Sequence, residues 1–564
     1  MPTHALAANE SDDASALSPS GRFRALKQAG LVMLCAAWSL LGTIGHDPWK
    51  TEDATAFGVA YEMLQRGDVL VPYLAGEPFV DRPPLAYAVA AATGMVFSPM
   101  LPMHDAGRLA AALMLGLTIL MLSATAIELQ GHAFRWMAVL LLIGSVGFWD
   151  RAHQLSPELG LMLGIAAALY GFALALRRPV VGGAMLGVGV AVAFLSRGFH
   201  GPVWVGLTAV ALPALFSTWR TRHYALTLAV ALVLAVALGG AWPLALFFRA
   251  PEHLQAWWTS QSLGEYVALL HPQKSGDALF LVKNLLWFAW PALPLVFWTL
   301  WTRGRGFNGG LATPAVQIPG VFALVITVAM MAMAEPRAIN LMPLLLPLSL
   351  LGALEIDTLK REFSGALDWF GILTFGLLAG LVWWLWFDAY AHSMSPPIAR
   401  LFRDTEVGYR PSFHWVAFGM SALLSLLWLA LVRPARRSNR RAVLNWAAGM
   451  TLLWGLYSTI WLPYLDSRRS YRTVAESVRA VLPRDGCTAS RNLGEAQRAL
   501  FHYFADLKTV REEVSAIDRC NALLVQYGRD DRDAKKPEGW EAVWNGRRRG
   551  DDTERYVLYV RSAP

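Results

Sequence analysis

Long apolar segments, separated by short polar stretches, run through most of this chain. They lie at residues 28–45, 84–99, 107–129, 133–149, 156–176, 181–197, 201–219, 223–248, 282–302, 316–334, 337–355, 365–388, 412–433 and 442–463. Most of them approach the roughly 20 apolar residues that a helix needs to cross a bilayer. The pattern therefore predicts an all-α polytopic membrane protein.

The two ends of the chain have a different pattern. In residues 466–564, "YRTVAESVRAVLP" has apolar positions at helical spacing, whereas "NALLVQYG" and "RYVLYVRS" are typical of short strands. We expect a small soluble α/β domain there. Residues 1–25 are polar and rich in Ser and Ala, and we expect them to be disordered and cytoplasmic.

Composition and charge agree with a membrane protein. The 564 residues are 55% hydrophobic and only 16% charged, with a formal net charge of +8. Basic residues gather in short loops between apolar segments, at 177–178, 220–223, 303–305, 360–361 and 433–441. Lys and Arg favour cytoplasmic loops, so the positive charge indicates topology and not a nucleic-acid partner.

The basic loops also predict which apolar segments cross. All of them fall on the cytoplasmic side only if one segment before residue 130 does not cross. The best candidate is 84–99, which is short and bounded by prolines, so it is interpreted as an interfacial or re-entrant helix. We therefore expect about thirteen crossings, a cytoplasmic N-terminus and an outer C-terminal domain. Residues 46–83 and 249–281 become outer loops.

Acidic residues on the predicted outer side are the main candidates for chemistry. Glu52 and Asp53 open the amphipathic stretch "EDATAFGVAYEML", Asp81 and Arg82 precede Pro83-Pro84, and Glu158 lies at the mouth of a later span. Ionisable groups close to the membrane are costly and are often functional. A carboxylate can act as a general base towards an acceptor hydroxyl. Glu158 could equally stabilise a helix N-terminus.

Three arginines lie on the outer side against the positive-inside bias. These are Arg82, Arg197 and Arg337. A guanidinium pairs well with phosphate oxygens, so these residues suit a lipid phosphate. Arg197 and Arg337 could instead be headgroup anchors. His200 and His271 are interpreted as structural residues.

Other classes of site have weak support in the sequence. No metal-ligand spacing, Walker loop or Gly-rich nucleotide fingerprint occurs. Cys487 and Cys520 could form a disulfide if the C-terminal region lies outside the cytoplasm, but the sequence leaves this open. Cys35 lies within the first apolar segment and is interpreted as an inert apolar residue.

The order of these features resembles the GT-C glycosyltransferases. The similarity is greatest to the bacterial branch that contains the 4-amino-4-deoxy-L-arabinose lipid A transferase, with protein O-mannosyltransferases more distant. The most specific stretch is "GDVLVPYLAGEPFVDRPPL", which is similar to the branch pattern G-D-W-x-x-P…K-P-P-L. "SRGFHGP" and "AINLMPLLLPLSLL" resemble two further family segments. Together these matches cover about residues 28–360.

The resemblance implies a function and a site. It predicts a GT-C transmembrane catalytic domain over 26–465 that transfers a sugar from a polyprenyl-phosphate donor to a lipid or other periplasmic acceptor by inverting displacement. The enzyme would lie in the bacterial inner membrane as a monomer. The catalytic Asp of the family falls on Glu52, with Asp53 in second place, and either of the two could act. Asp81 and Glu158 would shape the site.

Some family positions differ in this chain. The family continues its acidic pair with Arg and Tyr, where this chain has Thr55 and Ala56, and the Tyr of the later Pro-rich helix is Asn340. We therefore expect the lipid phosphate to depend more on Arg82, Arg197 and Arg337. Family members differ in metal dependence, so the resemblance predicts no certain cofactor and leaves a divalent metal open.

Two other functions compete with transfer. A polyprenyl-linked sugar transporter or flippase would need charged or broken helices at mid-membrane, ideally in two related halves, and no internal repeat is visible. A catalytically inactive GT-C scaffold is the other alternative, because of the changed positions. The acids at the outer mouth favour a transferase.

Overall fold

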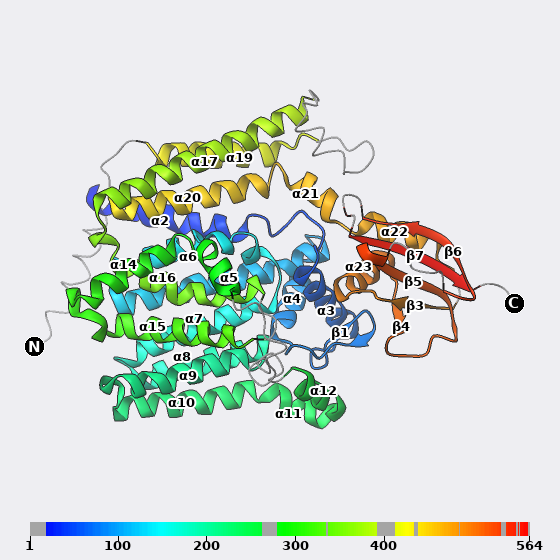
Figure 1. Cartoon of the computed structure of the whole chain (residues 1–564), viewed down its shortest axis with the longest axis horizontal. Coiled ribbons are helices and arrows are strands. Elements are labelled where there is room, and N and C mark those ends of the chain that lie inside the picture. The colour runs from blue at the N-terminus through cyan, green and yellow to red at the C-terminus, as the bar shows by residue number, and fades with distance from the viewer. Residues whose placement is uncertain are drawn as a thin grey trace, which may run out of the picture.

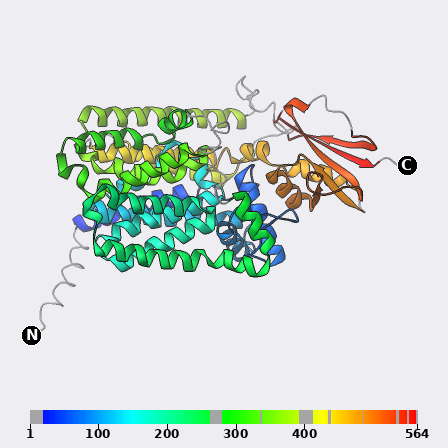
Figure 2. The ribbon, with the colours of Figure 1, turned by 60° about the horizontal axis from the view of Figure 1, so that its bottom comes forward.

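The computed structural model describes residues 19–261, 279–333, 337–391, 412–433, 438–483, 486–531, 537–548, 551 and 553–561. Within these ranges, a large helical bundle carries a smaller sheet-containing domain at one end (Figure 1). A view turned by 60° shows the same two parts side by side (Figure 2). The expectation of an all-α membrane protein with a small C-terminal α/β domain is confirmed.

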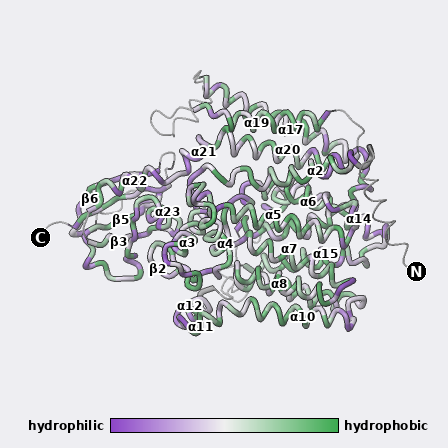
Figure 3. Tube along the Cα trace, turned by 180° about the vertical axis from the view of Figure 1, so that it is seen from behind, coloured by the Kyte–Doolittle hydropathy of each residue, from purple (hydrophilic) through white to green (hydrophobic). Residues whose placement is uncertain are grey.

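Long helices that lie roughly parallel to one another form the bundle (Figure 1). They are α2 (Pro19–Leu40), α5 (Met103–Gln130), α6 (Arg135–Ile143), α7 (Pro157–Ala175), α8 (Pro179–Arg197), α9 (His200–Leu215), α10 (Arg222–Gly239), α14 (Ala292–Gly304), α15 (Pro314–Met331), α16 (Leu345–Leu354), α17 (Arg361–Tyr390), α19 (Trp415–Leu431) and α20 (Asn439–Tyr457). Hydrophobic residues follow these helices, and hydrophilic ones gather at the bundle ends and in the C-terminal domain (Figure 3).

The described helices support several membrane crossings without confirming thirteen. Six are long and apolar enough to cross a membrane, and the bent pair α13 (Phe280–Phe288) and α14 would make seven. Five further apolar helices have 10–17 residues.

Some segments that look continuous in the sequence are divided into two helices in the structure. The pair α13 and α14 bends by 96° at Pro291, and 337–355 begins as the 3₁₀ helix η7 (Ala338–Leu344) around Pro343, because proline removes a helical hydrogen bond.

Burial separates the central helices of the bundle from the peripheral ones. The apolar window of α7 is 83% buried, whereas those of the continuous helix 222–249 and of α17 are 22% buried. Helices α7 and α8 approach closely at small residues. A Cβ on Gly164 would lie 2.5 Å from the backbone nitrogen of Ala193, so only glycine allows this spacing. The helix α7 is therefore a core element, and α10 and α17 are left to face lipid.

Two sequence boundaries differ in the structure. Helix α2 begins at Pro19, so residues 19–25 are helical and not part of a disordered end. The predicted outer loop 249–281 is partly helical, because α12 (Pro251–Gln261) follows α11 (Ala241–Arg249). In both places the polar composition suggested loop, whereas the residues form helix, and α12 is a separate helix that begins after Ala250.

The segment between α2 and α5 lies at the same end of the bundle as the C-terminal domain (Figure 1). It contains α3 (Glu52–Arg66), the hairpin β1 (Tyr73–Leu74) and β2 (Glu77–Pro78), and α4 (Leu85–Phe97). With 13 residues, α4 is about 20 Å long, which is shorter than the ~30 Å hydrocarbon core. This length agrees with the expectation that 84–99 does not cross.

The C-terminal domain is a mixed five-stranded sheet with helices packed against it. Its elements are α21 (Leu462–Arg469), α22 (Arg472–Val481), β3 (Cys487–Arg491), α23 (Glu495–Ala505), β4 (Thr509–Arg511), β5 (Cys520–Gly528), β6 (Trp540–Gly546) and β7 (Glu554–Arg561). The strand order is β4-β3-β5-β7-β6; β3 is parallel to β4 and β5, and β7 is antiparallel to β5 and β6. Cys487 and Cys520 are joined by a disulfide where β3 and β5 begin.

The C-terminal domain is docked onto α3 through α23. At Gly58 a Cβ would lie 2.5 Å from the Cβ of Ala499, so the two helices meet at a glycine. Lys50 forms an ion pair with Glu554, and His104 contacts the hydroxyl of Tyr503 at 3.1 Å. These contacts hold the loop before α3 against the sheet domain and so position the first turn of α3.

Candidate active site

A cavity of about 560 Å³ lies between the bundle end and the C-terminal domain. From the membrane part it is lined by Glu52, Asp81, Arg82, Tyr87 and Arg337, among others. From the C-terminal domain it is lined by Asn492, Gly494, Glu495, Gln497 and Gln526, among others. The cavity therefore joins residues more than 400 positions apart and is of the size of small-molecule sites.

Glu52 reaches this cavity from the first turn of α3. An acid is favoured in a first helical turn, where it faces the positive end of the helix dipole. Its side chain is 14% exposed and lies between two guanidiniums. Arg82 donates to Glu52 at 2.9 Å, and Arg337 lies 3.4 Å from its other oxygen.

Asp53 is adjacent in sequence but occupies a closed environment. Its side chain is 3% exposed and makes two hydrogen bonds with Arg108, at 3.2 and 3.3 Å. The backbone N–H groups of Trp49 and Leu155 also donate to it, at 3.2 and 3.1 Å. Burial would raise the pKa of the Asp53 carboxyl, but Arg108 outweighs that effect and holds the pKa below its ordinary value.

Glu158 lies behind Arg82, in the first turn of α7. It is paired with Arg197 at 3.1 Å and with Arg82 at 3.7 Å, and it is almost fully buried. Despite burial, the charges of Glu158 and Glu52 raise the pKa of Arg82 well above its usual range. Arg82 is thus held as a cation between two carboxylates, and Arg197 supports it indirectly through Glu158.

Asp81 and Glu495 form a second acidic group at the cavity. Burial raises the pKa of the Asp81 carboxyl, although Arg82 opposes that shift. Burial and then the charge of Asp81 raise the pKa of Glu495. The cavity therefore has one wall with the Arg82–Glu52–Arg337 cluster and another wall of acids and amides.

The structure brings together most of the residues expected from the sequence. Glu52, Asp81, Arg82 and Arg337 line one cavity, whereas Glu158 and Arg197 lie directly behind it. Asp53 faces away into a buried cluster. His200 is buried at the start of α9, where its Nδ1 lies 3.2 Å from the Arg197 carbonyl oxygen and its ring meets Trp204 edge-on. His271 lies outside the described residues.

Several important residues were missed by sequence reasoning. Arg108 lies inside an apolar segment, and an arginine there was itself a signal that a buried acid was near. Glu495 carried no such signal, because an acid in the first turn of a soluble helix is common. Among the described residues, no group of three or more His, Cys, Asp or Glu is arranged to hold a metal ion.

Comparisons with known proteins show which transferases the chain resembles in sequence. No family model matches the chain. It is 24% identical over 357 residues to undecaprenyl phosphate-α-4-amino-4-deoxy-L-arabinose arabinosyl transferase 2 of Pseudomonas fluorescens, covering 61% of this chain and 62% of that protein. It is 28% identical over 243 residues to the corresponding transferase of Serratia proteamaculans, covering 41% and 42%. The chain thus matches less than two thirds of the length of these relatives.

Solved structures share the fold over nearly the whole chain. ArnT from Cupriavidus metallidurans bound to undecaprenyl phosphate aligns with a TM-score of 0.68 and 16% identity, over 96% of this chain and 98% of that one. The oligosaccharyltransferase AglB from Archaeoglobus fulgidus, in complex with an inhibitory peptide and a dolichol-phosphate, aligns with a TM-score of 0.52 and 11% identity, over 90% and 70%. The GT-C resemblance stated from the sequence is confirmed at the level of the fold.

Proposed function

We propose that this protein is an integral-membrane glycosyltransferase that moves a sugar from a polyprenyl-phosphate donor to a lipid or other acceptor. The curated relatives are named as transferases for an undecaprenyl-phosphate-linked aminoarabinose, and the chain shares their sequence pattern over 357 residues in one case. Solved structures of the same fold contain undecaprenyl phosphate or dolichol-phosphate. The donor class is therefore a polyprenyl-phosphate sugar, such as an undecaprenyl-based one.

The observation that carries the proposal is the position of Glu52. It is a carboxylate that lines an open cavity between two guanidiniums, at the junction of a membrane bundle and a soluble domain. A general base needs access to the acceptor, and a lipid-phosphate leaving group needs cations close to that base. Glu52, Arg82 and Arg337 supply both in one place.

The reaction would be a single inverting displacement. The acceptor oxygen attacks the anomeric carbon as Glu52 takes its proton, and the bond from that carbon to the phosphate oxygen breaks on the opposite face. The leaving polyprenyl phosphate takes the bond electrons, and Arg82 and Arg337 stabilise its charge. Binding of the donor phosphate would compete with Glu52 for these guanidiniums and so free the carboxylate to act as the base.

Other charged residues would position this machinery. The Asp53–Arg108 pair fixes the start of α3, and the Glu158–Arg197 pair holds Arg82 in place. Asp81, Glu495 and the amides of the C-terminal domain face the same cavity and would hydrogen-bond the transferred sugar or the acceptor. One chain builds the whole described cavity, which agrees with a monomer.

The orientation follows from the basic loops. Glu158 begins α7 beside the cavity, so Arg177 and Arg178 lie past its other end, about 28 Å away for 19 residues. With those loops cytoplasmic, the cavity and the C-terminal domain face the periplasm from the inner membrane. A donor carried on a polyprenyl lipid would then enter from the outer leaflet.

Reconstituted transfer tests the proposal. Purified full-length protein in liposomes is given undecaprenyl-phosphate aminoarabinose or another undecaprenyl-phosphate sugar together with lipid A, and mass spectrometry follows sugar addition. We expect product with the parent protein and at least about a hundredfold slower transfer with Glu52→Gln at equal folded amount. Movement of the intact donor between leaflets without any glycosylated product would favour a flippase instead.

A further inference from the structure

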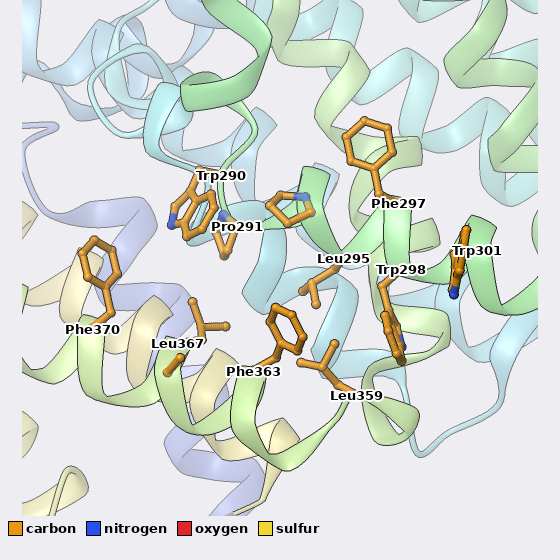
Figure 4. A pocket seen from close by; sticks show the side chains of 12 residues that line it. Trp290, Pro291, Leu295, Phe297, Trp298, Trp301, Leu359, Phe363, Leu367 and Phe370 are labelled. Carbon is orange, nitrogen blue, oxygen red and sulfur yellow. The ribbon is translucent and has the colours of Figure 1, made fainter.

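A second cavity lies on the membrane-facing side of the bundle, far along α14 from the C-terminal domain. It has a volume of about 680 Å³ and lies between α14 and α17. Its side chains, shown in Figure 4, are large and apolar, and they include Trp290, Leu295, Trp298, Trp301, Phe363 and Phe370. No part of the proposed transfer site contributes to this groove.

The groove has a deep end and a mouth. At the deep end Trp290 meets Phe370, with ring centroids 6.5 Å apart, beside the break where α13 bends away from α14. At the mouth Trp298 donates to the Thr358 hydroxyl at 3.1 Å. The lining part of α14, from its N-cap Pro291 to Trp301, rises about 15 Å, which is roughly half of the hydrocarbon core, or one leaflet.

Exposed cations surround the mouth of this groove. Arg305 stacks on Trp301 at 4.1 Å, and Lys360 and Arg361 directly follow the lining residue Leu359. Glu362 is an exposed acid beside them.

Two further acids at this end have cationic partners of their own. Glu355 is held by Arg303 at 2.6 Å, and Asp357 is paired with Arg440 at 2.5 Å. Since these acids are neutralised, the mouth keeps an excess of positive charge.

We propose that this groove binds one anionic glycerophospholipid, with an acyl chain against the aromatic side chains and the phosphate at Arg305, Lys360 and Arg361. An apolar slot one leaflet long with cations at its polar end is complementary to such a lipid. The deep end stops at Trp290, so the slot does not continue through the bilayer. With the basic loops cytoplasmic, the site takes its lipid from the inner leaflet.

Native mass spectrometry of the full chain tests this site. Protein in detergent is titrated separately with phosphatidylglycerol and phosphatidylcholine. We expect phosphatidylglycerol to bind in preference to phosphatidylcholine. The triple variant Arg305→Gln, Lys360→Gln, Arg361→Gln should raise its dissociation constant about tenfold or more, since each cation near a lipid headgroup contributes substantially.

Matched controls separate the groove from general surface charge. The variant Arg22→Gln, Lys27→Gln, Arg178→Gln removes three exposed cations elsewhere and should bind phosphatidylglycerol like the parent. Ala366→Trp, which fills the groove, should abolish the preference for phosphatidylglycerol. The two triple variants to Gln should keep the melting temperature of the parent. Equal affinity for phosphatidylcholine, or equal loss in both triple variants, would overturn the proposal.

Discussion

Two neighbouring carboxylates, at the end of the bundle next to the C-terminal domain, lie in two different electrostatic regions. Glu52 lines a cavity, together with Arg82 and Arg337, whose other wall is the C-terminal domain. The Asp53 cluster, with Arg108 and Asp105, is enclosed, and its arginine is 2% exposed. Both regions contain an acid and an arginine, so composition does not distinguish them. They differ in whether a substrate can reach the acid.

The difference arises from helix geometry. Consecutive residues on an α-helix point about 100° apart, so Glu52 and Asp53 at the start of α3 face different surroundings. Both oxygens of Asp53 accept several hydrogen bonds, which leaves no capacity for a substrate proton. Among the described residues, Glu52 has two ion-pair partners, Arg82 and Arg337, both at the cavity wall. The better candidate for the general base is therefore Glu52, the carboxylate with fewer partners, and not Asp53, the carboxylate with more.

The largest effect is expected at Glu52. Glu52→Gln keeps the shape of the side chain but cannot accept the proton, so kcat should fall about 10²–10⁴-fold. The melting temperature should stay close to that of the parent, because the side chain lies at a cavity wall. Steady-state transfer in liposomes measures kcat, and thermal unfolding of the same sample measures the melting temperature. Full activity of this variant would eliminate Glu52 as the base.

Asp53→Asn should act on stability instead. It removes one of the two carboxylates, Asp53 and Asp105, that pair with the buried Arg108, and breaking such a buried pair costs about 3–5 kcal/mol. We expect a large drop in melting temperature and in the yield of folded protein. Normal stability with abolished kcat would instead place Asp53 in the chemistry.

Arg337→Gln should weaken donor binding moderately. The side chain is 63% exposed, so its contact with a lipid phosphate is partly screened and worth about 1 kcal/mol, or about fivefold in KM for the donor. The value of kcat should change less than KM. Kinetics at varied donor concentration measure the changes in KM and in kcat separately. Arg249→Gln, at another exposed arginine, is the matched control. An unchanged donor KM would exclude Arg337 from the phosphate site.

Glu495→Gln should change recognition by the opposite wall of the cavity. Burial and Asp81 raise the pKa of Glu495, so lowering the pH neutralises this acid earlier than an ordinary glutamate. We expect a loss of about three- to tenfold in kcat/KM at pH 8, the cost of about one hydrogen bond. The loss should shrink as the pH falls, because the parent side chain is then also neutralised. A loss independent of pH would contradict this role.

The smallest effect is expected at Asp466, a half-buried acid that accepts hydrogen bonds from the backbone N–H of Asp47 and the indole N–H of Trp49. Burial and the charge of Asp47 raise its pKa to about 6. Because the folded-state pKa is raised, the cost in stability builds as the pH rises from about 4 to about 6, is fully present above that window and is absent below it. Asp466→Asn should raise the melting temperature at pH 8 but not at pH 4. An equal gain at both pH values would contradict this.

Much of the architecture could be read from local patterns. The apolar segments predicted the helices of the bundle, and the apolar run in "NALLVQYG" predicted the strand β5, because both signals lie within short stretches. The helix that begins at Glu52 followed in the same way. Segment continuity was less reliable, since the apolar segment 282–302 is divided by the bend at Pro291.

The chain sequence was sufficient for the fold class, and it predicted the acids and arginines that now line or support one cavity, since hydropathy, charge bias and motif order are properties of short stretches. The sequence was not sufficient to distinguish the surroundings of Glu52 from those of Asp53. That difference depends on Arg108, which is 55 residues away from Asp53 in the chain. The second wall of the cavity was equally hidden, since Glu495 meets Asp81 only when the C-terminal domain docks on α3. Long-range packing leaves no local periodicity, so these assignments required the assembled structure.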